Sequence, residues 1–185
     1  RLSEMALNLP LTVNMRNPRA VNVEASAFAA IPAPPCRREL IAPVDYRIVK
    51  KSRTVNRVVA ALLTELIAAG ANPTDIALLS FCKPADAFFA EGFRSIGLEV
   101  QILDGSQVGV KDNHILAASI PAFKGLESEI VVIGDLPNGK LNAWHRASLY
   151  VALTRARTAA YVICPESFVD YRVELIDRMA QEGGS

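Results

Sequence analysis

Short apolar runs alternate with longer segments of helical periodicity along most of this sequence. The clearest helical pattern follows Thr54: apolar residues between positions 55 and 67 recur at the i, i+3, i+4, i+7 spacing of an amphipathic helix, which Gly70 can end. Pro84 and Pro165 open two further predicted helices. The expected helices cover residues 55–70, 84–97, 142–156 and 165–183, with another starting near residue 18, and the expected strands cover residues 45–51, 75–81, 98–103, 114–120, 129–135 and 159–164.

This alternation predicts an α/β fold with a mostly parallel sheet and helices on both faces, because such strands are buried on both sides. In these sheets ligands bind in loops after the carboxyl ends of the strands, so we expect a binding site there. Three prolines within residues 32–35 predict an extended connector. We expect residues 1–44 to be an N-terminal segment of a single domain and residues 45–185 to be its α/β core.

The composition gives no overall electrostatic attraction of the chain to nucleic acid or to membranes. The 185 residues are 51% hydrophobic and 21% charged, which is typical of a folded globular domain. Lysine and arginine number 20 against 19 for aspartate and glutamate, for a net charge of +1. Because this balance creates no large field toward nucleic acid or membrane, any anion site must be local.

Cysteine and histidine are too dispersed to predict a metal site or a disulfide framework. Cys36, Cys82 and Cys164 form no C-x-x-C pair, and neither His114 nor His145 has a ligand-spaced neighbour. No apolar run reaches the roughly 18 residues of a bilayer span, and no signal-peptide pattern opens the chain. We therefore expect a cytoplasmic protein without its own metal or membrane contact. The sequence begins with arginine and not methionine, so we expect a fragment of a longer protein.

Motifs of a self-sufficient nucleotide-hydrolysing site are missing from the sequence. There is no phosphate loop of the form G-x-x-x-x-G-K-[ST] and no acidic pair at a strand end to hold magnesium. Asp135 ends a predicted strand alone, and no Ser-His-Asp or Cys-His set is visible. Three charged segments remain as candidates, namely "NMRNP" with Arg16, "SIPAFKGLESEIVVI" with Gly125 and Glu127, and "LYVALTRAR" with Arg155 and Arg157.

The residue types in these segments suit an anion or a sugar, but they leave alternatives open. Gly125 can let the backbone approach a ligand closely, and Glu127 can accept hydrogen bonds from ribose hydroxyls. Arg155 and Arg157 follow an apolar run. Cations at a helix end offset the helix dipole, whereas a bound phosphate explains the same arginines.

Together the segments resemble the second RecA-like motor domain of superfamily 1 DNA helicases, the UvrD/Rep-like group. "FKGLESEIVVIGDL" is followed about 15 residues later by "LYVALTRARTAAYVI", as in the family pattern T-x-H-x-x-K-G-L-E, an apolar strand, and a helix with Y-V-A-x-T-R-A. "LNLPLTVNMRNPRAVNVEASAF" is similar to the family's L-x-x-N-Y-R-x-x-x-x-I-x-x-x-A segment. The resemblance extends across nearly the whole chain. It implies a RecA-like α/β fold and the C-terminal motor domain of an ATP-dependent DNA helicase or translocase.

Position by position, the resemblance implies which residues face ATP. Arg155 matches the arginine that reaches the γ-phosphate across the cleft between two motor domains, and Arg16 matches a second γ-phosphate arginine. Glu127 matches the carboxylate that contacts the ribose, with Gly125 beside it. Met15 stands where the family has a tyrosine that stacks on adenine, and methionine gives less planar selectivity. Arginine suits this chemistry, because a guanidinium stabilises the charge that develops on the phosphoryl group in the transition state. An arginine finger raises the hydrolysis rate by about three to five orders of magnitude.

The resemblance also implies partners. Ser119 matches the threonine that contacts the backbone of bound single-stranded DNA, and Lys124 is expected near DNA or nucleotide. Pro121 replaces the family's histidine beside the DNA strand, which removes a polar contact. The phosphate loop and the Mg²⁺ ligands for ATP are expected on an N-terminal RecA-like domain of the parent chain, so the chain alone is expected to be inactive as an ATPase. Residues 104–113 leave no room for the large insertion of bigger family members.

Two alternatives remain open from the sequence. The chain can be a catalytically inert, helicase-like module for protein contacts, as the departures at Met15 and Pro121 allow. It can also be a free-standing α/β enzyme with an unrelated nucleotide, although the absence of a Gly-rich phosphate loop counts against this. Arg157 is interpreted as a surface charge at the end of the helix.

Overall fold

The structure is a computed structural model, and it describes residues 13–37, 44–50, 54–103 and 111–182. In order, the helices and strands are α1 (Arg19–Ala29), β1 (Val44–Ile48), α2 (Val55–Ala68), β2 (Ile76–Ser80), β3 (Glu99–Ile102), β4 (His114–Ser119), β5 (Ser128–Gly134), α3 (Ala143–Leu153), β6 (Ala156–Cys164) and α4 (Glu166–Glu182), with short 3₁₀ turns at Pro73–Asp75, Pro84–Asp86 and Arg94–Ile96. Helices and strands alternate in the first and last parts of the chain, whereas strands β2 to β5 follow one another without an α-helix between them in the described residues.

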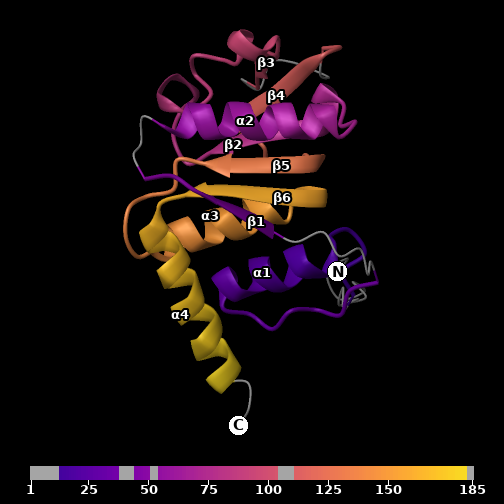
Figure 1. Cartoon of the computed structure of the whole chain (residues 1–185). Coiled ribbons are helices and arrows are strands. Elements are labelled where there is room, and N and C mark those ends of the chain that lie inside the picture. The colour runs from indigo at the N-terminus through magenta and orange to yellow at the C-terminus, as the bar shows by residue number, and fades with distance from the viewer. Residues whose placement is uncertain (1–12, 38–43, 51–53, 104–110, 183–185) are drawn as a thin grey trace, which may run out of the picture.

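A single six-stranded sheet organises the fold, in the order β1-β6-β5-β2-β4-β3 (Figure 1). Each neighbouring pair of these strands is parallel. The central strand β2 is buried along its whole length, which is typical of a parallel sheet that is covered on both faces. The predicted α/β class is therefore confirmed.

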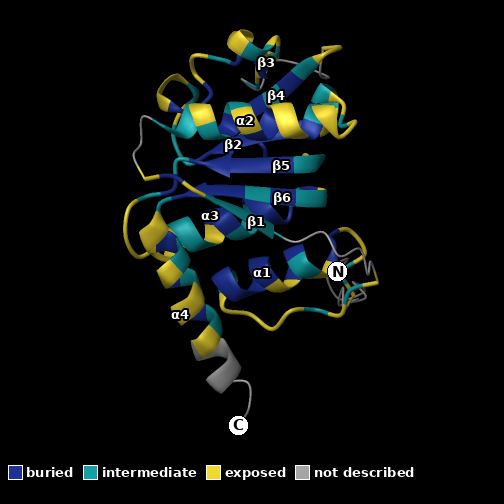
Figure 2. Cartoon of the chain, in the orientation of Figure 1, coloured by how far each residue is buried: buried dark blue, intermediate teal, exposed yellow. Residues whose placement is uncertain are grey.

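Alternate side chains of the strands pack into two separate hydrophobic cores. Leu79 packs with the apolar sides of α1, α3 and α4, whereas its neighbour Leu78 packs with α2. Successive side chains of a strand point to opposite faces, so these cores lie on the two sides of the sheet. Figure 2 shows the buried central strands between the partly exposed helices. Helices thus cover both faces, as predicted.

The helix predicted for residues 84–97 is wrong. After one 3₁₀ turn, the backbone amide of Phe88 donates to the Asp135 carboxylate at 2.9 Å and not to a carbonyl one helical turn earlier. Gly92 then adopts a φ of 70°, which ends any helical run. Three phenylalanines of this segment are buried against the sheet, namely Phe88, Phe89 and Phe93. Tertiary packing therefore overrides the local helical pattern.

The boundary between α3 and β6 also differs from the prediction. The helix was expected to continue through residue 156, but it ends at Leu153, and β6 begins at Ala156 and not at residue 159. The reason is strand pairing, since the amide of Ser128 donates to the carbonyl of Arg155 at 3.1 Å and Ala156 pairs with Ser128. Arg155 consequently lies in a two-residue turn and Arg157 in a strand.

A partly buried ion pair ties α1 to α4 and β1. Glu24 of α1 is only 8% exposed and accepts hydrogen bonds from Arg172 of α4 and, at 2.6 Å, from the hydroxyl of Tyr46. The Arg172 guanidinium also lies 4.8 Å from the centre of the Tyr46 ring. Burial and the Glu24 carboxylate raise the pKa of Tyr46, so its hydroxyl remains a donor. These contacts fix α1, and with it the segment that precedes α1, against the core.

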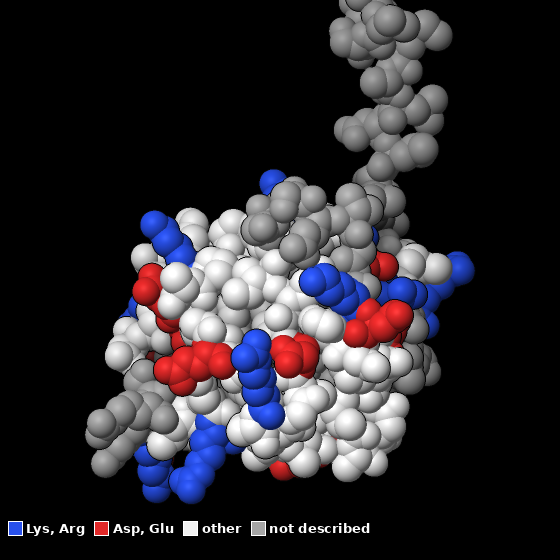
Figure 3. Space-filling model, turned by 90° about the horizontal axis from the view of Figure 1, so that it is seen from above, with Lys and Arg blue, Asp and Glu red and all other residues white. Residues whose placement is uncertain are grey.

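The surface and the sequence agree that charge is mixed. On the face seen in Figure 3, lysine and arginine lie among aspartate and glutamate, with no broad area of one sign. Within the described residues, no helix is both long and apolar enough to cross a bilayer. The predicted short connection between β3 and β4 falls largely on residues 104–110, which are outside the described part of the chain.

Replacing Gly134 tests the packing that takes the place of the predicted helix. A Cβ at this position would lie 2.5 Å from Cδ1 of the Phe88 ring, so Gly134→Ala is expected to destabilise the fold by about 1–3 kcal/mol in urea unfolding. Combining it with Phe88→Leu is expected to cost less than the sum of the two single changes, because leucine lacks the clashing ring. Strict additivity would contradict this packing.

Candidate functional site

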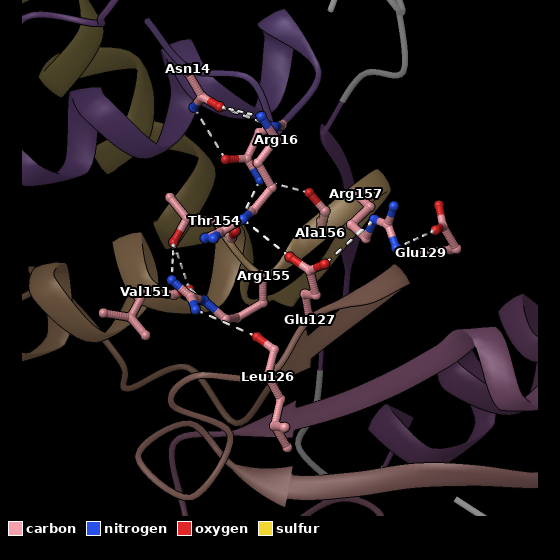
Figure 4. A network of polar contacts seen from close by, with 11 residues as sticks. Asn14, Arg16, Leu126, Glu127, Glu129, Val151, Thr154, Arg155, Ala156 and Arg157 are labelled. Atoms are coloured by element: carbon pink, nitrogen blue, oxygen red, sulfur yellow. Dashed lines mark hydrogen bonds and ion pairs between the residues drawn. The ribbon is translucent and has the colours of Figure 1, made fainter. Parts of the chain in front are cut away.

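The residues predicted to face ATP gather at the amino ends of β5 and β6. Glu127 immediately precedes β5, and Arg155 immediately precedes β6. The expectation of a site after the carboxyl ends of the strands is therefore wrong for this cluster. The turn between α3 and β6 is short, and the 120–127 loop returns to this edge, so the two residues face each other across paired strands (Figure 4).

A buried asparagine brings the N-terminal segment to the same place. Asn17 is 2% exposed, and its carboxamide nitrogen donates to the carbonyls of Thr154 at 2.9 Å and Ala156 at 2.7 Å. Asn14 shapes the segment, because its side-chain oxygen accepts from the amides of Arg16 and Asn17 at 2.9 and 3.1 Å. Arg16 is thereby presented beside the turn that carries Arg155.

Glu127 lies between two arginines from different segments. Its Oε2 atom is 3.1 Å from Nε of Arg16, and its Oε1 atom is 3.7 Å from Nε of Arg157 (Figure 4). These side chains are 40–51% exposed, so a ligand in solvent can reach them. The carboxylate is therefore already held by arginines in this state, and a sugar hydroxyl would have to share it.

Arg155 is held only by neutral oxygen atoms among the described residues. Its guanidinium donates to the carbonyls of Val151 and Leu126 at 3.2 and 3.4 Å and to the Thr154 hydroxyl at 3.3 Å. Partial burial and the nearby positive charge of Arg16 lower the pKa of Arg155. An anion placed between Arg16 and Arg155 would relieve this repulsion, and charge-assisted hydrogen bonds to such an anion are strong.

The remaining residues predicted to contact a nucleotide lie around this cluster. Gly125 has a φ of 90°, a conformation that favours glycine, and a Cβ at this position would meet no atom of the described residues within 4 Å apart from its chain neighbours. Met15 is 59% exposed next to Arg16. Its thioether is therefore available for contact with a flat apolar group.

Ser119 lies at the opposite, carboxyl ends of the strands. It ends β4 level with Ser80, and Ser80 is level with Gly134, the last residue of β5. Because Glu127 comes just before the first residue of β5, the two positions are separated by about 20 Å along the strands. The exposed Lys124 lies in the loop that joins these two positions, whose buried Ile120 and Phe123 anchor it to the core. The structure therefore places Ser119 far from the arginine cluster, whereas Lys124 is close to Glu127 along the chain.

Two residues of the cluster were not assigned to it from the sequence. Asn17 was not singled out, although an asparagine between an arginine and a proline is a turn signal. Arg157 was interpreted as a surface charge at a helix end, but it lies in β6 and pairs with Glu127 and Glu129. Among the described residues, no three His, Cys, Asp or Glu side chains are grouped to hold a metal ion.

Comparison with known proteins agrees with the resemblance noted in the sequence. Residues 114–163 match the family of the UvrD-like helicase C-terminal domain. This match runs from β4 to β6 and so includes Ser119, Glu127 and Arg155, but not Arg16. No curated protein matches the sequence. The resemblance to UvrD-like helicases is thus confirmed over that part of the chain.

Comparison with solved structures gives a fold-level likeness. The C-terminal domain of a possible DNA helicase from Lactobacillus plantarum WCFS1 has a TM-score of 0.62 at 13% identity, covering 83% of this chain and 89% of that one. The C-terminal part of the Fun30 ATPase domain has a TM-score of 0.44 at 15% identity, covering 64% of this chain and 44% of that one. The first likeness supports the RecA-like α/β fold predicted from the sequence.

Loss of the Asn17 side chain is expected to weaken both the fold and the cluster. Asn17→Ala leaves the buried carbonyls of Thr154 and Ala156 without this donor, so the free energy of unfolding in urea is expected to fall by about 1–3 kcal/mol. The exposed Asn138 provides the control, and Asn138→Ala is expected to change stability by less than about 0.5 kcal/mol. Equal effects of the two changes would contradict the role of Asn17.

Proposed function

We propose that this chain is the C-terminal motor domain of an ATP-dependent DNA helicase or translocase, and that it completes an ATP site on an N-terminal RecA-like domain of the same parent protein. The observation that carries this proposal is the meeting of Arg16 and Arg155, from segments far apart in sequence, around Glu127 at one edge of the sheet. The match to the UvrD-like helicase C-terminal domain over residues 114–163 supports it.

In the proposed reaction, the arginines act on the γ-phosphate of ATP. Phosphoryl transfer places negative charge on the equatorial oxygens, and Arg155 stabilises that charge as an arginine finger, with Arg16 as a second cation. Arg155 suits this role because its charge is held by neutral acceptors, so no internal carboxylate among the described residues has to be displaced. Glu127 accepts from the ribose, Gly125 permits close approach of the backbone, and Met15 packs against the base.

In this proposal, the residues that bind magnesium lie on the N-terminal domain and not on this chain. Mg²⁺ bound to ATP neutralises charge on the phosphates, and its protein ligands and the phosphate loop are proposed to lie on the N-terminal domain. Hydrolysis then depends on closure of the cleft between the two domains. That dependence couples ATP turnover to movement along a strand.

The proposed DNA contact uses a different part of the chain. Ser119 and Lys124 lie at and beyond the carboxyl end of β4, and they are assigned to single-stranded DNA. Because the arginine cluster lies at the opposite edge of the sheet, one domain can touch nucleotide and DNA at once without the two ligands competing for space.

Removal of the Arg155 guanidinium is expected to abolish most hydrolysis. In the full-length parent, Arg155→Ala is expected to lower kcat for ATP in the presence of single-stranded DNA by about a thousandfold or more. Arg155→Lys is expected to restore little, because an ammonium lacks the planar fork. Arg94→Ala is the matched control, since Arg94 forms an exposed ion pair with Glu99 on β3, and it is expected to leave kcat unchanged. A fall of less than tenfold for Arg155→Ala would overturn the proposal.

The chain by itself is expected to be inactive. The purified 185-residue chain is expected to hydrolyse ATP no faster than a buffer blank, because the phosphate loop is not in its sequence. Phosphate release is measured with and without single-stranded DNA. Sustained turnover by this chain would contradict a site shared between two domains.

A further inference from the structure

Arg157 was interpreted from the sequence as a surface charge, but its geometry in the structure indicates more. In β6, Ala156 pairs with Ser128 and Ala159 pairs with Ile130, so β6 has one residue more than β5 between these pairs. Such a bulge redirects side chains that would otherwise alternate between faces. Here Arg157 and its neighbour Thr158 both reach Glu129: Nη1 of Arg157 lies 3.4 Å from Oε1, and the Thr158 hydroxyl donates to Oε2 at 2.5 Å.

The guanidinium of Arg157 bridges two carboxylates. Nη1 faces Glu129, while Nε lies 3.7 Å from Oε1 of Glu127 (Figure 4). The Thr158 hydroxyl holds Glu129 in place, and Glu129 in turn holds the Arg157 guanidinium. Arg157 therefore links the position of Glu127, in the loop, to that of the strand. A lysine ammonium is a single point charge on a flexible stem and cannot keep this two-pronged geometry.

Arg157 balances the pull of Arg16 on the same carboxylate. Arg16 approaches Oε2 of Glu127 from the N-terminal segment, and Arg157 approaches Oε1 from β6. Without Arg157, the attraction of Arg16 would be the only one of the two left to orient the carboxylate. Because the side chains of Arg157 and Glu127 are 47% and 40% exposed, their ion pair contributes little to stability. Stability of the fold therefore does not account for this arrangement.

We propose that Arg157 is a positioning residue that holds Glu127 in place for the sugar hydroxyls of the nucleotide, and so determines the preference for a ribonucleotide over a deoxyribonucleotide. This inference rests on the proposed function, in which Glu127 contacts the ribose. Sugar selectivity then depends on the bulge in β6, which orients Arg157, and on the hydrogen bond from Thr158 that holds Glu129.

The test measures sugar preference in the full-length parent. KM and kcat are determined for ATP, 2′-deoxy-ATP and 3′-deoxy-ATP with single-stranded DNA. The wild-type protein is expected to favour ATP over at least one deoxy analogue by about tenfold or more in KM, as expected for loss of a hydrogen bond to a charged group. Arg157→Ala and Arg157→Lys are both expected to reduce this preference about tenfold, while kcat for ATP changes by less than about threefold.

Two further variants make the result specific. Glu129→Gln is expected to weaken the preference in the same direction, because it removes one of the two carboxylates that Arg157 bridges. Arg94→Ala, which breaks an exposed ion pair on β3, is expected to leave the preference unchanged. Melting temperatures of all variants are expected to lie within a few degrees of wild type, so that a change in KM does not reflect unfolding.

The possible outcomes separate this inference from the proposed function. If Glu127→Ala removes the sugar preference but Arg157→Ala does not, the role of Arg157 is overturned while the nucleotide site stands. If Arg157→Lys behaves as wild type, the bridging geometry is overturned. If Glu127→Ala leaves the preference intact, the ribose contact and the inference both fail. If Arg155→Ala retains full turnover, the proposed function itself fails.

Discussion

The candidate site depends on one buried contact, the carboxamide of Asn17 against the carbonyls of Thr154 and Ala156. These carbonyls lie on either side of Arg155, in a turn that separates a helix from a strand, and Asn17 directly follows Arg16 in the chain. A single side chain therefore supplies the turn with donors and brings Arg16 to it. Because Asn17 is buried, water does not compete for this contact, and the backbone next to both arginines is anchored to the core.

Electrostatics explains why this arrangement suits an anion. Arg16, Arg155 and Arg157 converge on a small area in which Glu127 and Glu129 supply the negative charges. Arg155 relies on neutral oxygens, and its pKa is lowered by burial and by Arg16. A chain with a net charge of only +1 thus concentrates positive charge where two segments meet, while the face in Figure 3 remains mixed. A phosphate at this place would gain from arginines that are already oriented.

The parallel sheet places two sets of polar residues at opposite edges. In parallel strands, the loop after one strand must cross the sheet before the next strand begins, and residues 120–127 make this crossing from Ser119 to Glu127. Ile120 and Phe123 bury the underside of the loop, so its exposed residues are presented outward in a defined order. The loop thus connects the position of Ser119 with that of Glu127 through a segment anchored in the core.

The sequence by itself determined the α/β class, the approximate positions of the strands and part of the candidate site, because apolar runs, helical periodicity and short motifs are local. Arg16, Glu127 and Arg155 could be named from their motifs, and the resemblance implied that all three face one nucleotide, but it did not specify the contacts that bring them together. Only the tertiary structure decided the rest. Phe88 donates its amide to Asp135, so no helix forms there; Ser128 pairs with Ala156, so α3 ends early; and a bulge turns Arg157 toward two carboxylates. Each of these outcomes depends on a partner distant in sequence, and for that reason no local pattern could predict it.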